Sequence, residues 1–190
     1  MSILQYSSPA GWLEAVLEDF DSFLQDHASA EKKASGMAIN MISHYPDRTR
    51  LVEVMADLAI EELNHYREVL RLLHQRGLHP AADGRDPYVT QFRKSLRKGS
   101  DAYFLDQLLI AGIIEARGAE RFGLVAEALP AGKLKTFYQA IARSECRHYE
   151  TFFELARGYF PERDVDQRIA CLLQTEAEIC ADLPHRAALH

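Results

Sequence analysis

The sequence predicts an all-α protein, built as a four-helix bundle with one long crossover and extra flanking helices. Along every long segment, apolar residues recur at steps of three and four and not at steps of two. Prolines and glycines separate these segments into lengths typical of helices. The two halves of the chain also repeat one pattern of glutamate and histidine residues, which predicts two copies of one helical hairpin.

Each helix is expected between two such breaks. A short helix is predicted after Ser8, which has the side chain of an N-cap. Asp47 is expected to cap the third helix, and Gly77 to end it. The segment 77–100 is the long crossover, and the tail after residue 181 is expected to be loose. The six longer predictions are helices at about 20–45, 47–75, 88–98, 101–129, 133–159 and 161–181.

The composition is that of a globular protein, with 47% hydrophobic and 26% charged residues. We expect a single domain over residues 1–190, with the core bundle at about 20–159 and a C-terminal helix at about 161–181. No segment approaches the roughly 20 apolar residues of a membrane span, and no signal sequence is evident. A cytoplasmic protein with no membrane partner is therefore expected. The three cysteines have no CxxC spacing and fit reduced thiols.

Charge is distributed unevenly along the chain. The net charge is −6, but residues 71–98 contain seven basic and two acidic side chains, so this segment carries +5 and the remainder −11. The total argues against indiscriminate nucleic-acid binding, whereas the basic segment could contact a polyanion. A solvated basic loop is the alternative. The candidate substrate-binding residues are Arg93, Lys94, Arg97 and Lys98, with Arg71 and Arg76 nearby in the sequence.

Two Glu-x-x-His motifs, Glu62 to His65 and Glu145 to His148, occupy positions in the apolar stripes of their helices. At this spacing both side chains leave one face of a helix within a single turn. A buried carboxylate without a partner would protonate or move, so each pair needs a cation or a dense hydrogen-bond network.

The internal repeat adds one more carboxylate to each motif. Glu31 and Glu115 each lie 15 residues before a proline, and they precede Glu62 and Glu145 by 31 and 30 residues. Antiparallel helices would bring all these side chains to one level of the bundle. Four carboxylates balance two divalent ions, and this donor set suits iron or manganese, although zinc and copper would also bind. The predicted metal ligands and catalytic residues are Glu31, Glu62, His65, Glu115, Glu145 and His148.

Each of these features has an alternative interpretation. A buried salt-bridge network would need cations, and no Lys or Arg falls in the four stripes. Glu61 also precedes His65, but Ser144 takes its place in the second copy, so the repeat selects Glu62. His27 either orients substrate or a ligand, or is a satisfied core histidine. Small residues beside the carboxylates, among them Gly112, favour a cavity or else close helix packing.

These residues resemble a known family. The Glu and Glu-x-x-His pattern, written twice, is that of the ferritin-like di-iron carboxylate proteins. More narrowly, the sequence is similar to the MiaE family of tRNA hydroxylases. The similar stretches are Asp26-His27-Ala28, Glu31-Lys32-Lys33-Ala34, Glu61-Glu62-Leu63-Asn64-His65, Glu115-Ala116-Arg117 and Glu120-Arg121-Phe122.

The resemblance implies a ferritin-like four-helix bundle that holds two iron ions and uses O2 as co-substrate. It implies a monooxygenase that hydroxylates the isopentenyl side chain of 2-methylthio-N6-isopentenyladenosine, next to the anticodon in tRNA. The two electrons would come from an external reductase or ferredoxin, since the sequence has no GxGxxG loop. The alternatives are a ferritin-like protein for iron oxidation or storage, and a di-metal oxidase of a small molecule. A monomer is favoured, because the final helix could cover the remaining apolar face of the bundle.

Overall fold

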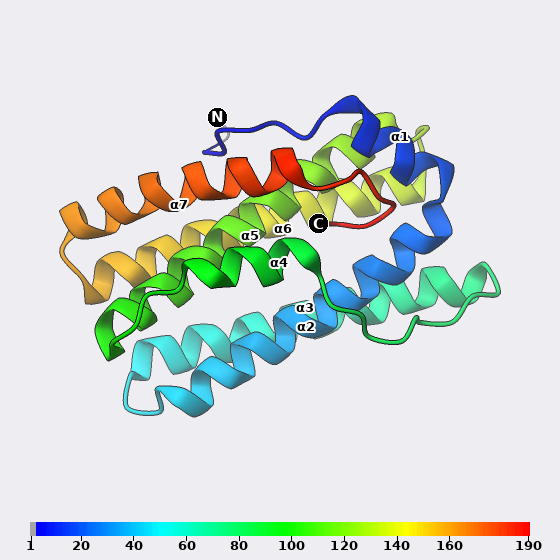
Figure 1. Cartoon of the computed structure of the whole chain (residues 1–190). Coiled ribbons are helices and arrows are strands. Elements are labelled where there is room, and N and C mark those ends of the chain that lie inside the picture. The colour runs from blue at the N-terminus through cyan, green and yellow to red at the C-terminus, as the bar shows by residue number, and fades with distance from the viewer. Residues whose placement is uncertain (1–2) are drawn as a thin grey trace. The chain divides into compact units, whose positions relative to one another are not determined.

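The structure, a computed structural model, describes residues 3–190. Throughout these residues it contains helices and no strand, so the predicted all-α class is confirmed (Figure 1). No helix in the described range combines the length and apolar character needed to cross a bilayer. The elements are α1 (Ala10–Glu18), α2 (Phe20–His44), α3 (Thr49–Gln75), α4 (Pro87–Phe92), the 3-10 helix η1 (Arg93–Ser95), α5 (Ser100–Ala128), α6 (Lys133–Tyr159) and α7 (Glu162–Asp182).

The chain divides into two compact units, which are described separately. The α2–α3 unit comprises Glu14–Gly84 and Arg186–Leu189. The α5–α6 unit comprises the residues up to Leu13, then Arg85–His185 and His190. The single domain over residues 1–190 stays a prediction.

The α2–α3 unit is an antiparallel helical hairpin (Figure 1). α2 begins after Asp19, whose carboxylate accepts the backbone N–H of Ser22 at 3.1 Å. α3 ends before Gly77, which has a φ of 74°, a left-handed conformation that glycine adopts without strain. Between the helices, Ser35 Oγ donates a hydrogen bond to the carbonyl of Ala59 at 2.8 Å. The hairpin thereby fixes α2 against α3 at the level of Glu31.

The predicted N-cap of α3 is wrong. α3 begins at Thr49, with Arg48 at the N-cap position and no side-chain hydrogen bond at the cap. Asp47 lies one residue earlier, inside a turn closed by the bond from Arg48 N–H to the carbonyl of Tyr45 at 3.1 Å. The turn after Pro46 therefore uses Asp47 as a turn residue, which its side chain suits equally well.

The α5–α6 unit is built around α5, the helix with the most buried residues. α6 runs antiparallel beside it, and α7 lies along both (Figure 1). A Cβ at Gly112 would lie 2.8 Å from Phe153 Cε1 and 3.1 Å from Phe152 Cβ. Gly112 therefore permits close packing of α5 on α6 and does not line a cavity.

The crossover helix is shorter than predicted. Helix over 88–98 was expected, but α4 ends at Phe92, and one 3-10 turn follows before Leu96 becomes extended. Asp106 explains the difference, because its buried carboxylate accepts the backbone N–H of Arg97 at 2.8 Å and draws the chain out of helical geometry. The same carboxylate binds the guanidinium groups of Arg97 and Arg168 at 2.8 Å each. Asp106 thereby fixes the turn into α5.

Ser8 does not cap α1, which corrects the predicted N-cap. Its backbone N–H and its hydroxyl both donate to the Glu120 carboxylate at 2.7 Å. That carboxylate also accepts a bond from Arg117 Nη1 at 2.6 Å. Charged partners on α5 therefore hold Ser8. A hydrogen bond to a charged group is stronger than the neutral hydrogen bond that Ser8 would make as an N-cap.

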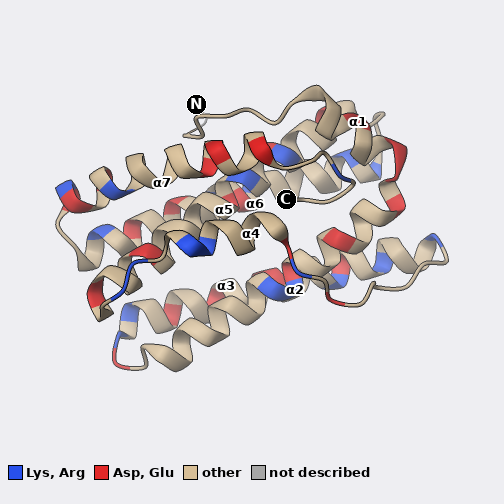
Figure 2. Ribbon diagram, viewed as in Figure 1, with Lys and Arg blue, Asp and Glu red and all other residues tan. Residues whose placement is uncertain are grey.

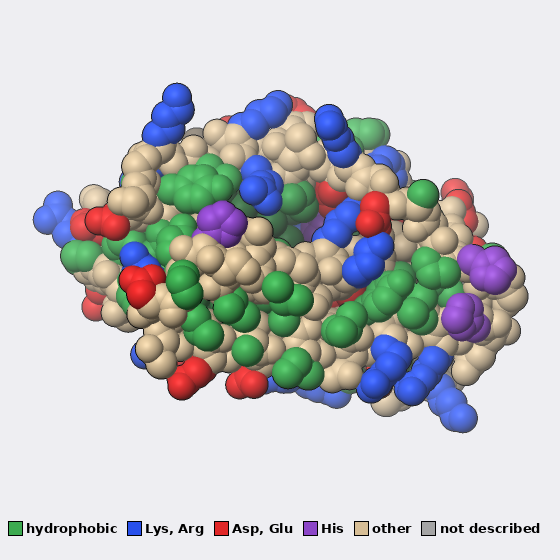
Figure 3. Space-filling view, turned by 90° about the horizontal axis from the view of Figure 1, so that it is seen from below, with side chains coloured by type: hydrophobic (Ala, Val, Ile, Leu, Met, Phe, Trp, Pro, Cys, Tyr) green, Lys and Arg blue, Asp and Glu red, His purple; other side chains and the backbone are tan. Residues whose placement is uncertain are grey.

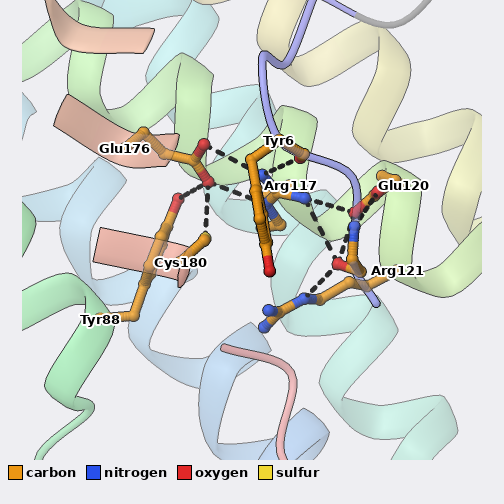
Figure 4. Close-up of polar contacts among 8 residues, drawn as sticks. Tyr6, Tyr88, Arg117, Glu120, Arg121, Glu176 and Cys180 are labelled. Atoms are coloured by element: carbon orange, nitrogen blue, oxygen red, sulfur yellow. Dashed lines mark hydrogen bonds and ion pairs between the residues drawn. The ribbon is translucent and has the colours of Figure 1, made fainter. Parts of the chain in front are cut away.

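Arg117 joins α5 to α7 in the interior of this unit. Its guanidinium binds both oxygens of Glu176 at 2.8 and 3.0 Å, and both side chains are fully buried. The Tyr88 hydroxyl and the Cys180 thiol each donate to Glu176 Oε1 at 3.1 Å, and all three side chains point toward this carboxylate (Figure 4). Burial alone would raise the pKa of Cys180, and with the neighbouring Glu176 it rises to about 12 although Arg117 opposes this. The thiol is therefore protonated and structural.

The C-terminal tail is ordered, so the expectation of a loose tail is wrong. In the α2–α3 unit, the backbone N–H of Leu189 donates to Asp26 Oδ2 at 2.7 Å, and the Leu189 side chain is buried. In the α5–α6 unit, the ring of His190 stacks on Tyr88 at 4.9 Å and its Nδ1 lies 3.2 Å from Asp86. Buried apolar contact and charge pairing hold the tail in place.

Candidate metal centre

The α2–α3 unit contains one half of the predicted ligand set. Glu31 on α2 and Glu62 and His65 on α3 each offer a ligand atom within 4.8 Å of the others. His65 Nδ1 lies 3.2 Å from Glu62 Oε2 and 3.6 Å from Glu31 Oε2. Both carboxylates are buried, so their charge needs a partner, and one imidazole stands between them.

His27 binds one of the two carboxylate oxygens of Glu31, Oε1. Its Nε2 lies 2.6 Å from Glu31 Oε1, and the ring is fully buried one helical turn before Glu31. Burial alone would raise the pKa of Glu31, but the hydrogen bonds of His27 and His65 outweigh it, so the pKa lies well below its usual range. Glu31 is thus a carboxylate at any ordinary pH.

The imidazole of His65 responds to the same charges. Burial alone would lower its pKa, but the adjacent Glu31 and Glu62 carboxylates raise it to about 10. In the metal-free protein this ring carries a proton, which stands in for a cation between the two carboxylates. A metal ion would displace that proton, because only the neutral imidazole binds a metal.

Glu61 and Glu62 differ in their surroundings. The Glu62 side chain is 1% exposed and faces His65 Nδ1, whereas the Glu61 side chain is 40% exposed and lies 3.9 Å from His65 Nε2. The choice of Glu62 as the ligand stays a prediction, and the burial of its carboxylate supports it.

The α5–α6 unit contains the other half of the ligand set. Glu115 on α5 and Glu145 and His148 on α6 also offer ligand atoms within 4.8 Å of one another. His148 Nδ1 lies 3.8 Å from Glu115 Oε2 and 3.8 Å from Glu145 Oε1, and all three residues are buried. The two halves therefore repeat one arrangement, in which an imidazole Nδ1 faces two carboxylates.

Local packing explains why these side chains point inward. The apolar neighbours of the second motif at helical spacing, Tyr138, Ile141 and Phe152, are buried on the same face of α6. A Cβ on Gly118 would lie 3.6 Å from Glu145 Oε2, so α5 approaches this carboxylate at ordinary contact distance. Ser144, the counterpart of Glu61, has its hydroxyl 3.4 Å from His148 Nε2.

The donor set of each half fits a metal ion. Each half supplies two carboxylates and one imidazole, ligands that suit iron and manganese. Helix pairs that each supply Glu and Glu-x-x-His are the usual ligand source of di-iron carboxylate proteins.

The basic crossover residues do not form one uniform group. Arg97 binds Asp106 through its side chain and backbone, as described above. Arg93, Lys94 and Lys98 are exposed, and within the described chain no ion pair is found for them. Figure 2 shows this basic segment following α4. These three side chains are therefore available to phosphates, whereas the Arg97 side chain already binds Asp106.

Arg71 and Arg76 are exposed on the last turns of α3 and just beyond them. Arg76 Nε donates to Asp21 at 2.7 Å, and its guanidinium lies over the ring of Phe20, 5.5 Å from the centroid. Arg76 thus ties the end of α3 to the start of α2.

Apolar side chains also reach the surface of this protein (Figure 3). Ile60 and Leu63 on α3 are 62% and 52% exposed, and they flank the buried ligand candidate Glu62. The ligand face of α3 is therefore buried, whereas the opposite face at the same level presents apolar groups to solvent.

A family model and two curated relatives are similar to this chain in sequence. The family model described as tRNA-(MS[2]IO[6]A)-hydroxylase (MiaE) matches residues 1–190. The tRNA 2-(methylsulfanyl)-N(6)-isopentenyladenosine(37) hydroxylase of Pseudomonas putida is 35% identical over 174 residues, 90% of this chain and 83% of that protein. The protein of the same name from Salmonella typhimurium is 31% identical over 130 residues, 68% of this chain and 47% of that protein.

A solved structure is similar over the whole chain. It is described as protein 43 with aldehyde deformylating oxygenase activity from Synechococcus, and it matches with a TM-score of 0.94 and 30% identity. The match covers 100% of this chain and 96% of that one. This likeness confirms the predicted ferritin-like fold class.

Proposed function

The chain belongs to the MiaE family, and from that membership we propose that it hydroxylates the isopentenyl side chain of 2-methylthio-N6-isopentenyladenosine in tRNA. The curated relatives carry this substrate in their names, with position 37 as the modified nucleotide. Neither iron storage nor oxidation of a small molecule receives support from these relatives.

One observation in the molecule carries the proposal. Each helical hairpin supplies a Glu and a Glu-x-x-His motif, and in each the imidazole Nδ1 faces two buried carboxylates. Five buried polar groups and the half-buried His65 are costly unless they bind something. We infer that Glu31, Glu62, His65, Glu115, Glu145 and His148 together hold two iron ions.

The iron ions, when bound, supply reductive activation of O2 for attack on an unactivated C–H bond. The residues of the chain hold the donor atoms at fixed places and remove them from water. Glu31 keeps its negative charge through His27 and His65, so it needs no deprotonation before a cation enters. His65 loses its proton when the cation arrives, which makes metal uptake dependent on pH.

The exposed cations of the crossover are the proposed contacts to tRNA. Phosphate binding by Lys and Arg provides most of the sequence-independent affinity for nucleic acids. Arg93, Lys94 and Lys98 extend into solvent, whereas Arg97 positions the segment through Asp106. The three free cations therefore carry this part of the proposal.

The reaction also needs partners outside the chain. Hydroxylation with O2 consumes two electrons, so an external donor of the reductase or ferredoxin type is proposed. Because the proposed substrate is tRNA, a cytoplasmic location is proposed. A monomer is proposed because α7 already covers α5 and α6 with the buried residues Val165, Leu172 and Ile179.

The direct test is hydroxylation in a host that lacks this activity. The wild-type chain and its Glu62→Gln variant are expressed there, and tRNA nucleosides are analysed by mass spectrometry. The wild type is expected to add one oxygen atom to the isopentenyl adenosine, and Glu62→Gln to add none.

Glu68→Gln is the matched control, since Glu68 lies on the same helix and is exposed. It should hydroxylate as the wild type does. Failure of the wild type to modify the nucleoside, with the protein folded and iron present, would refute the proposed function.

A further inference from the structure

A hollow of about 360 Å³ lies at the end of the α5–α6 unit where α5 and α7 both begin (Figure 1). We name it the end pocket. Its volume is near the lower end of the range for small-molecule sites, about 300–1,000 Å³. None of the proposed metal ligands lines it. Its walls include Arg97, Asp101, Phe160, Asp164, Gln167 and Arg168.

One buried carboxylate fixes both arginines of the end pocket. Arg168 donates to the two oxygens of Asp106 at 2.8 Å each and to the carbonyl of Ser95 at 2.7 Å. Arg97 donates to the same carboxylate at 2.8, 3.0 and 3.1 Å, and 44% of its side chain stays exposed. Fixed guanidinium planes are surfaces on which unpaired bases stack.

Phe160 supplies an aromatic wall. Its ring is half-buried and packs against the buried ring of Phe104, with centroids 5.8 Å apart. The ring is therefore supported from inside the unit while it lines the end pocket. Aromatic rings and guanidinium groups are the two kinds of surface on which proteins stack the bases of single-stranded RNA.

Three further side chains of the end pocket are available for hydrogen bonds. Asp101 lies in the first turn of α5, Asp164 in the first turn of α7, and Gln167 one turn further along α7. All three are exposed, and within the described chain no hydrogen bond or ion pair is found for their side chains. Carboxylates only accept hydrogen bonds, whereas an amide accepts and donates. These groups favour a ligand with an amino group.

The charge of the end pocket argues against an anionic ligand. Two arginines and two aspartates line it, so their charges cancel, and the buried Asp106 adds one negative charge. A phosphate would meet carboxylates that have no cation of their own, whereas a neutral base would not. Phosphates have another place nearby, since the exposed Lys98 follows Arg97 in the crossover.

We propose that the end pocket binds one unpaired nucleobase of the tRNA loop, and that this base bears an amino group. The inference rests on the proposed tRNA function. Asp101 and Leu105 precede Glu115 on α5 by 14 and 10 residues. At a rise of 1.5 Å per residue, the pocket lies about 15–21 Å along the helix from this proposed metal ligand. The bound base is therefore a neighbour of the modified nucleotide in the loop, a few nucleotides away.

The end pocket would give the enzyme a second point at which it reads its substrate. Contacts to phosphates position a nucleic acid but contain no sequence information, whereas contacts to base edges do. The exposed cations of the crossover would accordingly provide affinity for any tRNA. Stacking and hydrogen bonding in the end pocket would provide selectivity among tRNAs.

The test is a thermodynamic cycle between the end pocket and the RNA loop. The probe is an anticodon stem-loop with 2-methylthio-N6-isopentenyladenosine at position 37, and each other loop nucleotide is replaced in turn by an abasic residue. Affinity for the chain is measured by fluorescence anisotropy. In the wild type, one of these replacements should weaken binding about 10–100-fold, the usual effect of losing a stacked base.

Phe160→Leu removes the flat ring but keeps an apolar side chain against Phe104. It should weaken binding of the intact stem-loop by a similar factor. The abasic replacement at the position read by the pocket should then cost no more than about a further twofold, because the two changes remove the same contact. The dependence of binding on salt should stay that of the wild type, since no phosphate contact is lost.

Asp164→Ala perturbs the end pocket without touching the core, because Asp164 is exposed. It should weaken binding of the intact stem-loop and leave binding of the abasic one unchanged. Phe137→Leu, a half-buried phenylalanine on α6, and Asp182→Ala, an exposed aspartate at the end of α7, are the matched controls. Both should bind as the wild type does, and circular dichroism checks that each variant folds.

Three results would overturn the inference. Phe160→Leu and Asp164→Ala that bind the intact stem-loop as tightly as the wild type would show that the end pocket holds no base. Losses that add to those of the abasic replacements at every loop position would show the same. A smaller salt dependence in Phe160→Leu would show that a phosphate lies there instead. A wild type that binds no stem-loop would refute the tRNA function itself, so the two failures are distinguishable.

Discussion

Replacing Glu176 by glutamine is expected to destabilise the protein by about 3 kcal/mol, near the lower end of the range for breaking a buried ion pair. The substitution leaves Arg117 fully buried and removes the charge to which its Nε and Nη2 donate at 2.8 and 3.0 Å. The lower end applies because Arg117 also binds Glu120 at 2.6 Å, so one negatively charged partner of the buried guanidinium remains in the variant. At about 2–4 °C per kcal/mol for a chain of this size, the melting temperature should fall by about 6–12 °C.

Thermal and urea unfolding followed by circular dichroism measure this effect. Glu178→Gln, two residues along α7 and exposed, is the matched control and should change stability by less than about 0.5 kcal/mol. The double variant Arg117→Met with Glu176→Leu should recover most of the loss, because it removes both buried charges. An equal effect of the two glutamine variants would refute the view that Glu176 compensates Arg117.

Three further predictions concern pH, tRNA and packing. Hydrogen bonding and charge from His190 overcome burial and lower the pKa of Asp86 from 3.8 to about 2, so its contribution of roughly 2 kcal/mol is full above pH 3.8 and is lost as the pH falls toward 2. Asp86→Asn should accordingly be less stable than the wild type at neutral pH, with a difference that disappears in acid unfolding series. Lys94→Glu with Lys98→Glu should weaken tRNA binding and flatten its dependence on salt, and an unchanged slope in filter binding would remove these lysines from the interface. Gly112→Ala should cost about 1–3 kcal/mol by overpacking against α6, whereas Gly36→Ala, which faces open space, should be neutral or stabilising in the same unfolding assay.

The long helices could be predicted from the sequence because their apolar periodicity and breaks are local properties. α2, α5 and α6 begin and end within a residue or two of the expected positions. The Glu and Glu-x-x-His pattern could likewise be found, because the repeat shows which glutamates share a position. The repeat favours Glu62 over Glu61 as the ligand, and the Glu62 side chain is buried whereas the Glu61 side chain is partly exposed.

Two of the errors arose where a charged partner outside the segment competes with a local preference. Ser8 has the side chain of an N-cap, yet Glu120 binds it from α5, more than a hundred residues away. Asp106 likewise shortens α4 by binding the N–H of Arg97, and nothing in the crossover itself signals that contact. Charged partners outside the segment decide these two local structures, and periodicity contains no information about them.

The role of His27 also required coordinates. Its position one turn before Glu31 leaves two interpretations open, a residue that orients substrate or a ligand, or a satisfied core histidine. The 2.6 Å approach to Glu31 Oε1 supports the first, with Glu31 as the group that the ring orients. The four-residue spacing permitted that contact, but rotamer and burial determine whether it forms.

The number of iron ions bound per chain tests the central claim most directly. Metal-free protein is titrated anaerobically with Fe²⁺, and the bound metal is counted after removal of free ions. The account predicts two iron ions per chain in the wild type and fewer in both Glu62→Gln and Glu145→Gln, one variant from each hairpin. A wild type that binds no iron, or variants that both still bind two ions with unchanged affinity, would contradict it.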